Sequence, residues 1–226
     1  MYNPCGMQRL LPRWVCLLAI CSVPGWATPL CATDSLANYI SAGSCQLGNF
    51  TLDNFGYTFT GGASYIGISD NNITVTPYIA TDVLGLQFSS GDFAEPAGDS
   101  ATLVVTYTWD PGDIRSLEDI LDPPSYMVQI ATVCCENAPF SIGCTPSDNL
   151  AVSDNGITLI ATDTVSFSPG VFTLGIQNTI DLDGTGGATA AFSYFDNQIT
   201  IPEPSTVAPC LLLAVLVSGR LRLKRA

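Results

Sequence analysis

The sequence predicts an all-β protein: an antiparallel β-sandwich, jelly-roll or immunoglobulin-like, with one short helical segment and a C-terminal transmembrane helix. Three observations lead to this prediction. Between its two ends, the chain has short runs rich in Val, Ile, Thr, Tyr and Phe, which suit half-buried strands. Turn residues separate these runs at roughly the 8–12-residue spacing of a sandwich. Each end of the chain instead carries an apolar run with basic residues beside it.

Residues 1–27 are typical of a secretory signal peptide. Two arginines precede an apolar run over residues 14–23, and a Pro-Gly pair ends that run. Small residues at the positions that signal peptidase reads predict cleavage after Ala27, with Ala32 as the second choice. An uncleaved membrane anchor is the alternative.

Residues 28–200 form the predicted secreted domain, and export would place its cysteines in an oxidising compartment. Cys134 and Cys135 are neighbours, so they are expected to point to opposite faces of a strand and to bridge to different partners. We expect one bridge between Cys135 and Cys144. We expect another between Cys45 and Cys134, and the swapped pairing stays open because sequence alone does not set connectivity. Cys31 is then expected to be free, or removed if cleavage follows Ala32. A zinc site is the alternative use of these thiols, but paired CxxC spacing is absent.

The first predicted strand covers residues 50–59. Apolar residues alternate with polar ones on either side of an Asp53-Asn54 step, which predicts a β-bulge there. An Asn155-Gly156 pair later in the chain predicts a hairpin with a primed turn. The other predicted strands cover residues 73–80, 84–89, 101–109, 126–134, 157–167, 171–180 and 189–194.

One segment, residues 113–121, has the apolar spacing of a helix instead of a strand. Ile114, Leu117, Ile120 and Leu121 fall on one helical face, and two prolines follow as a stop. This spacing predicts one or two helical turns that join the two sheets.

The charge distribution excludes several classes of function. The formal net charge is -13, and Arg115 is the only basic residue between the two terminal segments. Such an acidic domain repels DNA and RNA, so nucleic-acid binding is not expected. The chain has no histidine, which removes the commonest general base and metal ligand and rules out a Ser-His-Asp or Cys-His site. We therefore expect a protein that is not an enzyme and needs no cofactor.

Three weaker chemical candidates remain in the domain. Asp181 and Asp183, followed by glycine, have the spacing with which calcium loops begin, although an ordinary Gly-rich turn explains it as well. The cluster at Glu118, Asp119 and Asp122 contains the two carboxylates that a glycosidase needs, but solvated charges are the commoner reading. Four aromatic residues would stack on sugar rings if they were exposed on one sheet face, and otherwise belong to the core. They are Tyr107, Trp109, Tyr126 and Tyr194.

The C-terminal segment, residues 201–226, has three parts in a fixed order. A rigid, extended turn comes first, because each proline fixes its own φ and restricts the residue before it. An apolar run over residues 207–217 follows, and a basic end favours the cytoplasmic side of a membrane. The turn is Pro202, Glu203 and Pro204, and the basic residues are Arg220, Arg222, Lys224 and Arg225.

This segment resembles the PEP-CTERM sorting signal of Gram-negative bacteria. The resemblance implies that an exosortase-type membrane protease recognises Pro202, Glu203 and Pro204, that the apolar run holds the chain in the membrane, and that the basic end stops transfer. The apolar run is shorter than the ~17–25 residues of a spanning helix. A looser resemblance to the opening of secreted PEP-CTERM proteins, at Cys45, Gly48 and the strand after them, implies a β-sandwich without catalysis.

The resemblance also implies a location and a role. The protein would be secreted or displayed on the cell surface, held for a time in the inner membrane, and associated with exopolysaccharide or biofilm. The alternative is a secreted carbohydrate-binding module, helped or not by calcium, and a glycoside hydrolase that uses only carboxylates is the third hypothesis. The partners expected on this basis are signal peptidase, the exosortase-type protease and an extracellular polysaccharide.

Overall fold

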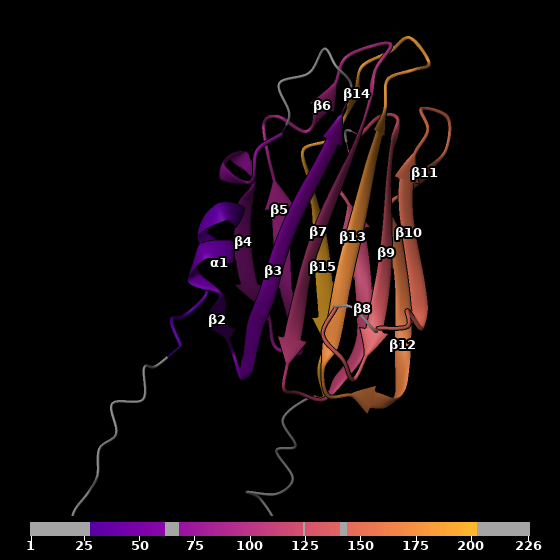
Figure 1. Ribbon diagram of the computed structural model, residues 1–226. Helices are drawn as coiled ribbons and strands as arrows, with labels where there is room; N and C mark the ends of the chain where they lie inside the picture. The colour runs from indigo at the N-terminus through magenta and orange to yellow at the C-terminus, as the bar shows by residue number, and fades with distance from the viewer. Residues whose placement is uncertain (1–27, 62–67, 124, 141–143, 203–226) are drawn as a thin grey trace, which may run out of the picture.

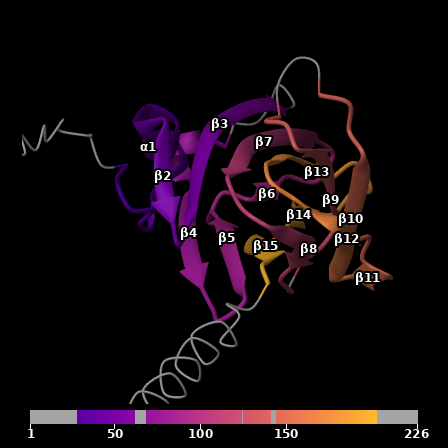
Figure 2. The same cartoon turned by 90° about the horizontal axis from the view of Figure 1, so that it is seen from below.

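The computed structural model describes residues 28–61, 68–123, 125–140 and 144–202. These residues form two antiparallel β-sheets packed face to face, so the predicted antiparallel β-sandwich is confirmed. Figure 1 shows one sheet in front of the other, and the view from below in Figure 2 shows both layers. The predicted signal peptide and the segment from residue 203 onward lie outside the described residues.

The long strands of the chain are divided between a six-stranded sheet and a seven-stranded sheet. The six-stranded sheet has the order β1 (Asp34–Ser35), β4 (Thr74–Ile79), β5 (Val83–Ser89), β15 (Tyr194–Thr200), β8 (Ile114–Leu121), β12 (Thr162–Val171). The seven-stranded sheet has the order β11 (Leu159–Ile160), β10 (Asp148–Asp154), β9 (Val128–Glu136), β13 (Leu174–Asp183), β7 (Ser100–Asp110), β3 (Phe50–Gly61), β2 (Ser44–Leu47). From β7 onward the chain passes repeatedly from one sheet to the other, which agrees with the jelly-roll alternative of the prediction.

Three small elements complete the fold. A two-stranded ladder pairs β6 (Ala94–Glu95) with β14 (Ala190–Ala191) at one end of the sandwich. A helix, α1 (Leu36–Ala42), and a 3-10 turn, η1 (Asp70–Asn72), lie beside the edge strands. In the part of the chain that the structure describes, no helix combines the length and apolar character needed to cross a membrane.

The core lies between the sheets and is rich in aromatic side chains. Trp109 and Tyr107 of β7 are fully buried and face Phe88 of β5 and Phe195 of β15. Phe88 and Phe195 stack with ring centroids 5.0 Å apart, and the ring of Tyr107 lies 5.8 Å from that of Phe88. Such large buried surfaces dominate the hydrophobic stabilisation of a sandwich.

The predicted bulge in the first long strand is confirmed. The register between β3 and β7 shifts between Asp53 and Gly56, and Asn54 has a positive φ of 56°. The extra residue turns Phe55 inward, where its ring stacks 5.8 Å from Tyr107.

Helix α1 is a feature that the sequence analysis missed. The Ser35 hydroxyl caps it by accepting a hydrogen bond from the Asn38 backbone at 3.3 Å, and Gly43 ends it with φ 78°. Its inward face carries Leu36 and Tyr39, which are buried against β3. The helix is short, so these contacts and its caps stabilise it more than helix propensity does.

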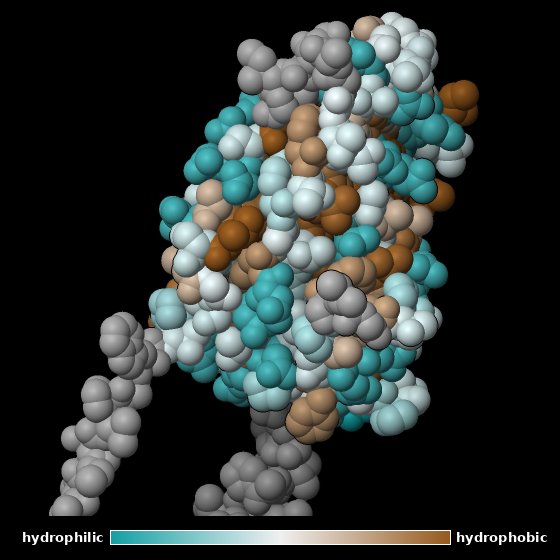
Figure 3. Space-filling model, viewed as in Figure 1, coloured by the Kyte–Doolittle hydropathy of each residue, from teal (hydrophilic) through white to brown (hydrophobic). Residues whose placement is uncertain are grey.

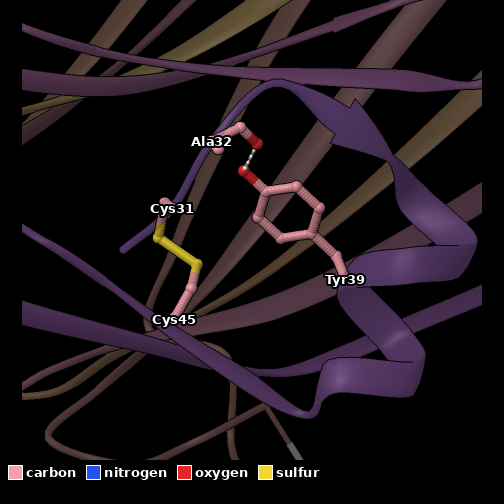
Figure 4. Close-up of a disulfide and its surroundings, with 4 residues drawn as sticks. All are labelled: Cys31, Ala32, Tyr39 and Cys45. Atoms are coloured by element: carbon pink, nitrogen blue, oxygen red, sulfur yellow. Dashed lines mark hydrogen bonds between the residues drawn. A yellow bond between two sulfur atoms is a disulfide. The ribbon is translucent and has the colours of Figure 1, made fainter. Parts of the chain in front are cut away.

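The N-terminal arm is tied to this region by a disulfide. Cys31 bonds to Cys45 of β2, with 4.9 Å between the Cα atoms. Figure 4 shows Tyr39 extending from α1 so that its hydroxyl donates a hydrogen bond of 2.7 Å to the Ala32 carbonyl, next to this bridge. The backbone N–H of Cys31 also bonds the carbonyl of Gln46 at 2.9 Å, which aligns the arm with β2.

The disulfide predictions are therefore half right. The bridge between Cys135 and Cys144 is confirmed. The prediction of a bridge between Cys45 and Cys134 is wrong, because Cys134 is a buried free thiol that faces the core. The prediction that Cys31 is free is also wrong, because the arm brings Cys31 beside β2, where it bonds to Cys45. Burial raises the pKa of the Cys134 thiol strongly, with Asp119 as the next cause.

The predicted helix over residues 113–121 is also wrong, because this segment is the strand β8. Ile114, Leu117, Asp119 and Leu121 are buried, and the residues between them are partly or fully exposed. The inward position of Asp119 interrupts the apolar alternation, which made the spacing resemble that of a helix. The neighbouring strand β12 also has a register shift opposite the start of β8, so the pairing of these two strands is irregular there.

The remaining strand predictions need smaller corrections. Strand β10 was not predicted, and the strand predicted over residues 157–167 is divided into β11 and the longer β12. The hairpin at Asn155-Gly156 is present between β10 and β11, but only Gly156 has a positive φ, of 78°. A primed turn of the predicted kind needs positive φ at both residues, so the turn type is wrong. The Asn155 carboxamide oxygen instead accepts hydrogen bonds from the Ile157 and Thr158 backbones.

Candidate functional site

The outer face of the six-stranded sheet carries a continuous polar surface. On β15 positions 195, 197 and 199 are buried, so Asp196 and Gln198 point outward. The register places Gln87 of β5 beside Asp196, and Thr76 of β4 beside Gln87. In the next row across the sheet, Gln198 of β15 lies beside Glu118 of β8.

Four of these outward residues, together with Tyr78 of β4, line an open hollow of about 360 Å³. They come from three neighbouring strands and provide a phenol, a hydroxyl, two carboxamides and one carboxylate. They are Thr76, Tyr78, Gln87, Asp196 and Gln198. Side chains of this kind donate and accept hydrogen bonds in several directions, as polar sites that orient a ligand require.

Tyr78 provides the aromatic surface of this hollow. Gly85 of β5 lies directly across from Tyr78 in the sheet, and a Cβ at Gly85 would come within 2.2 Å of the Tyr78 Cζ and hydroxyl oxygen atoms. The ring therefore lies over the Gly85 backbone, and the phenol extends toward β15. Burial raises the pKa of the Tyr78 phenol well above its usual value, with the nearby Asp196 as the second cause.

Asp196 is a partly buried carboxylate. Burial raises its pKa to about 6, an effect that a hydrogen bond from the Gln87 side chain opposes and the charge of Asp122 reinforces. One carboxylate oxygen of Asp196 is buried and makes no hydrogen bond within the described residues, and the buried hydroxyl of Tyr78 lies beside the Gln198 side chain. Both atoms lie beneath the surface of the hollow, so a ligand would contact the exposed parts of these two side chains.

A second hollow, of about 510 Å³, lies at the end of the same face. Thr74, Ser89 and Tyr194 line it, and they form the next cross-strand row after Thr76, Gln87 and Asp196. Outward residues of one strand are about 7 Å apart, so Gln198, Asp196 and Tyr194 mark a track of about 14 Å along β15.

The opposite face of the molecule has a different character. Figure 3 shows the outer face of the seven-stranded sheet, where apolar and polar residues are interspersed. Its outward side chains are mostly small, including Thr58, Val104, Thr179 and Ala131 in one row across the sheet. That row therefore contains no aromatic, carboxamide or carboxylate side chain, unlike the rows of the polar face.

The predicted calcium candidates lie outside the polar face. Asp181 points outward from β13 and accepts a hydrogen bond of 2.6 Å from the Thr102 hydroxyl. Asp183 accepts hydrogen bonds from the backbone and hydroxyl of Thr185, which hold the pKa of Asp183 below its usual value. Both line a hollow of about 390 Å³ together with Asp154. Among the residues that the structure describes, no three His, Cys, Asp or Glu side chains converge as a metal site.

The carboxylates predicted as a cluster are divided between the two faces of β8. Glu118 points outward, next to Gln198, whereas Asp119 points inward and is completely buried. Neighbouring strand residues project to opposite faces, so Glu118 and Asp119 do not act on one substrate. The backbone N–H of Asp122, just after β8, bonds the carbonyl of Tyr194 at 3.3 Å.

Asp119 belongs instead to a polar network between the sheets. It accepts a hydrogen bond of 2.7 Å from the Asn197 carboxamide. The oxygen of Asn197 accepts from the hydroxyl of Tyr107 and from the carboxamide of Asn178, both at 2.7 Å. Thr132 donates to Asn178 at 2.7 Å. All of these residues are buried, and they connect β8 and β15 of one sheet to β7, β9 and β13 of the other.

The four aromatic residues considered as sugar-stacking candidates are divided in the same way. Tyr107 and Trp109 belong to the core, and the ring of Tyr126 lies against Gly156 in a loop. Only Tyr194 reaches the polar face, where a hydrogen bond with Asp122 raises the pKa of its phenol. Sequence reasoning missed Tyr78. The outward alternation of Thr74, Thr76 and Tyr78 was the only available sign of it.

Comparison with known proteins gives little further information. No protein-family model matches the chain, and no curated protein matches it. Among solved structures, the chain is similar to TmCBM61 in complex with β-1,4-galactotriose, with 11% identity and a TM-score of 0.29, over 64% of this chain and 83% of that one.

Two further structures are similar at the same level. A family 11 carbohydrate-binding module from Clostridium thermocellum, in complex with a β-1,3-1,4-mixed-linked tetrasaccharide, has 8% identity and a TM-score of 0.24, over 76% of this chain and 97% of that one. The enzymatically active domain of bacteriophage CBA120 tailspike protein 4 has 13% identity and a TM-score of 0.30, over 65% of this chain and 19% of that one. TM-scores this low establish no shared function, so the polar face is interpreted from its own residues.

Proposed function

We propose that the chain is an exported, non-enzymatic surface or matrix protein whose six-stranded sheet binds polysaccharide on its outer face. The observation that supports this function is the hollow in which Tyr78 lies beside Gln87, Asp196 and Gln198. A flat aromatic ring packs against the apolar face of a sugar, and amides and carboxylates bond its hydroxyls. The track continues toward Tyr194, which suits a chain of sugars better than a compact small molecule.

The experiment is affinity electrophoresis of the purified protein in gels that contain soluble polysaccharides. Tyr78→Ala and Gln198→Ala are expected to weaken the affinity measured by retardation about fivefold to thirtyfold, because each removes about 1–2 kcal/mol of stacking or hydrogen bonding. Gln177→Ala is the matched control, since Gln177 points outward from the seven-stranded sheet. Equal retardation of all three variants would refute binding on this face.

The proposed export route rests on the termini, which lie outside the described residues. The signal peptide would direct the chain across the inner membrane, and an exosortase-type protease would act at Pro202, Glu203 and Pro204. Glu203→Ala is expected to leave the protein in the cell envelope, whereas Glu136→Ala, an exposed glutamate of β9, should leave release unchanged. Normal release of the Glu203→Ala variant, measured in fractionated cultures, would contradict the sorting role.

A further inference from the structure

The polar face has an unusual balance of charge. Its ionisable side chains are all acidic: Glu118, Asp196 and Asp122, together with the phenols of Tyr78 and Tyr194. The acidic Asp119 lies just beneath this face, inside the sheet. No lysine, arginine or histidine side chain neutralises any of these groups among the described residues, because the described ranges contain a single basic residue.

That basic residue, Arg115, is already paired. Its guanidinium lies 2.7 Å from the Asp113 carboxylate at the beginning of β8, and both side chains are about half exposed. Glu118 and Asp196 lie at diagonal positions on adjacent strands, which places them on one side of Tyr78 within reach of one bound sugar. The face therefore presents at least two carboxylates to a ligand without supplying a compensating cation.

We infer that the polysaccharide that this face selects carries free amino groups, as partly or fully deacetylated glucosamine polymers do. This inference rests on the proposed function and adds the class of ligand. An ammonium group at the hollow would donate charge-assisted hydrogen bonds to the carboxylates of Asp196 and Glu118, which lie on adjacent strands. Polysaccharides that contain uronic acids would be repelled, because their carboxylates would face those of Glu118 and Asp196.

The geometry favours an amino sugar over a basic peptide. Gln87, Gln198 and Thr76 lie in the same two rows as the carboxylates, and their amide and hydroxyl groups match the hydroxyls of a sugar. Tyr78 lies at the other end of the row that contains Glu118 and offers a flat apolar surface. Calcium is a poorer match, since no three carboxylates or other ligating side chains converge in the part of the chain that the structure covers.

Isothermal titration calorimetry of the purified protein near neutral pH tests this inference with three hexasaccharides. One is a β-1,4-linked glucosamine hexamer, one is its fully N-acetylated counterpart, and one is the corresponding glucose hexamer. The glucosamine hexamer is expected to bind about tenfold more tightly than the other two, which is the effect of one charge-assisted hydrogen bond. Added salt should reduce this preference.

Matched variants connect the preference to the face. Asp196→Asn and Glu118→Gln are each expected to reduce the preference for the glucosamine hexamer about threefold to tenfold, with little effect on the N-acetylated hexamer. Asp181→Asn and Glu136→Gln, two acidic residues of the other sheet, should leave the preference unchanged. Asp196→Asn removes a partly buried charge that has no cationic partner among the described residues, so the variant is expected to fold and to be at least as stable as the parent.

The outcomes separate the two proposals. Equal affinity for the three hexamers, or a preference that requires calcium, would overturn the amino-sugar inference and leave polysaccharide binding intact. Failure of every hexamer and every polysaccharide to bind would overturn both. Competition by polylysine as strong as that by the glucosamine hexamer would also overturn the inference, because charge alone would then explain the binding.

Discussion

Replacing Asp119 with asparagine is expected to change how the free energy of unfolding depends on pH. Asp119 is completely buried between the sheets, and one of its oxygens has no hydrogen-bond partner within the described residues. Burial raises the pKa of this carboxyl to about 7, and the nearby Asp163 and Glu118 act in the same direction. The hydrogen bond from the Asn197 carboxamide opposes the shift without cancelling it.

The direction and size of the effect follow from linkage between protonation and folding. An unfolded Asp loses its proton near pH 4, whereas the folded protein keeps the proton on Asp119 until about pH 7. The folded state therefore binds more protons in this window, so stability falls as pH rises through it. At about 1.4 kcal/mol per pKa unit, the loss from this group amounts to roughly 4 kcal/mol between about pH 4 and pH 8.

The assay is urea unfolding followed by tryptophan fluorescence, because Trp109 is buried in the core. The carboxamide that Asp119→Asn introduces stays neutral, so the stability of the variant relative to the parent is expected to rise by roughly 4 kcal/mol between about pH 4 and pH 8. Asp196 titrates in the same direction in both proteins and cancels in the comparison. Glu136→Gln, at an exposed position, should show the same dependence of the free energy of unfolding on pH as the parent. If Asp119→Asn shows that same dependence, the account of Asp119 as a strongly perturbed acid is wrong.

Three further changes test the fold and the support of the polar face. Cys31→Ser opens the bridge to Cys45 and is expected to lower the free energy of unfolding by about 3 kcal/mol under oxidising conditions, as for a loop of this length. An equally large difference between variant and parent under reducing conditions would contradict this explanation. Tyr107→Phe removes a buried donor from the inter-sheet network and should cost about 1–2 kcal/mol in urea unfolding, and a neutral result would mean that the network does not stabilise the sandwich. Gly85→Ala places a methyl group where the ring of Tyr78 lies, so it should displace the ring and weaken polysaccharide binding at least about fivefold by affinity electrophoresis, with near-parental retardation as the contradicting result.

The regular parts of the fold could be predicted from sequence because they depend on local pattern. The alternation in β3 and the Asp53-Asn54 step sufficed for the strand and its bulge. The segment 113–121 failed because its pattern is set by a distant residue. Asp119 occupies an inward position that looks unsuitable for a strand until Asn197, 78 residues later, supplies its hydrogen bond.

The candidate site could not be predicted for a similar reason. Tyr78 and Gln87 lie on a hairpin that sequence pattern could place, but Asp196 and Gln198 join them only because β15 pairs with β5. Nothing local in the sequence sets that pairing between such distant segments of the chain. The bridge from Cys31 to Cys45 was likewise hidden, because the course of the arm along β2 decides it.

The buried network and the polar face are two consequences of one strand register. On β15 the buried Asn197 lies between Asp196 and Gln198, so a slip of one residue would turn the amide outward and both site residues into the core. Asn197 is bonded to Asp119 within its own sheet and to Tyr107 and Asn178 of the other sheet, and such a slip would leave these polar groups unpaired. An apolar residue at position 197 would remove this penalty and weaken the distinction between the two registers. The cost of burying polar groups in this core is thus the physical reason that the outer face presents its amides and carboxylates in one fixed arrangement.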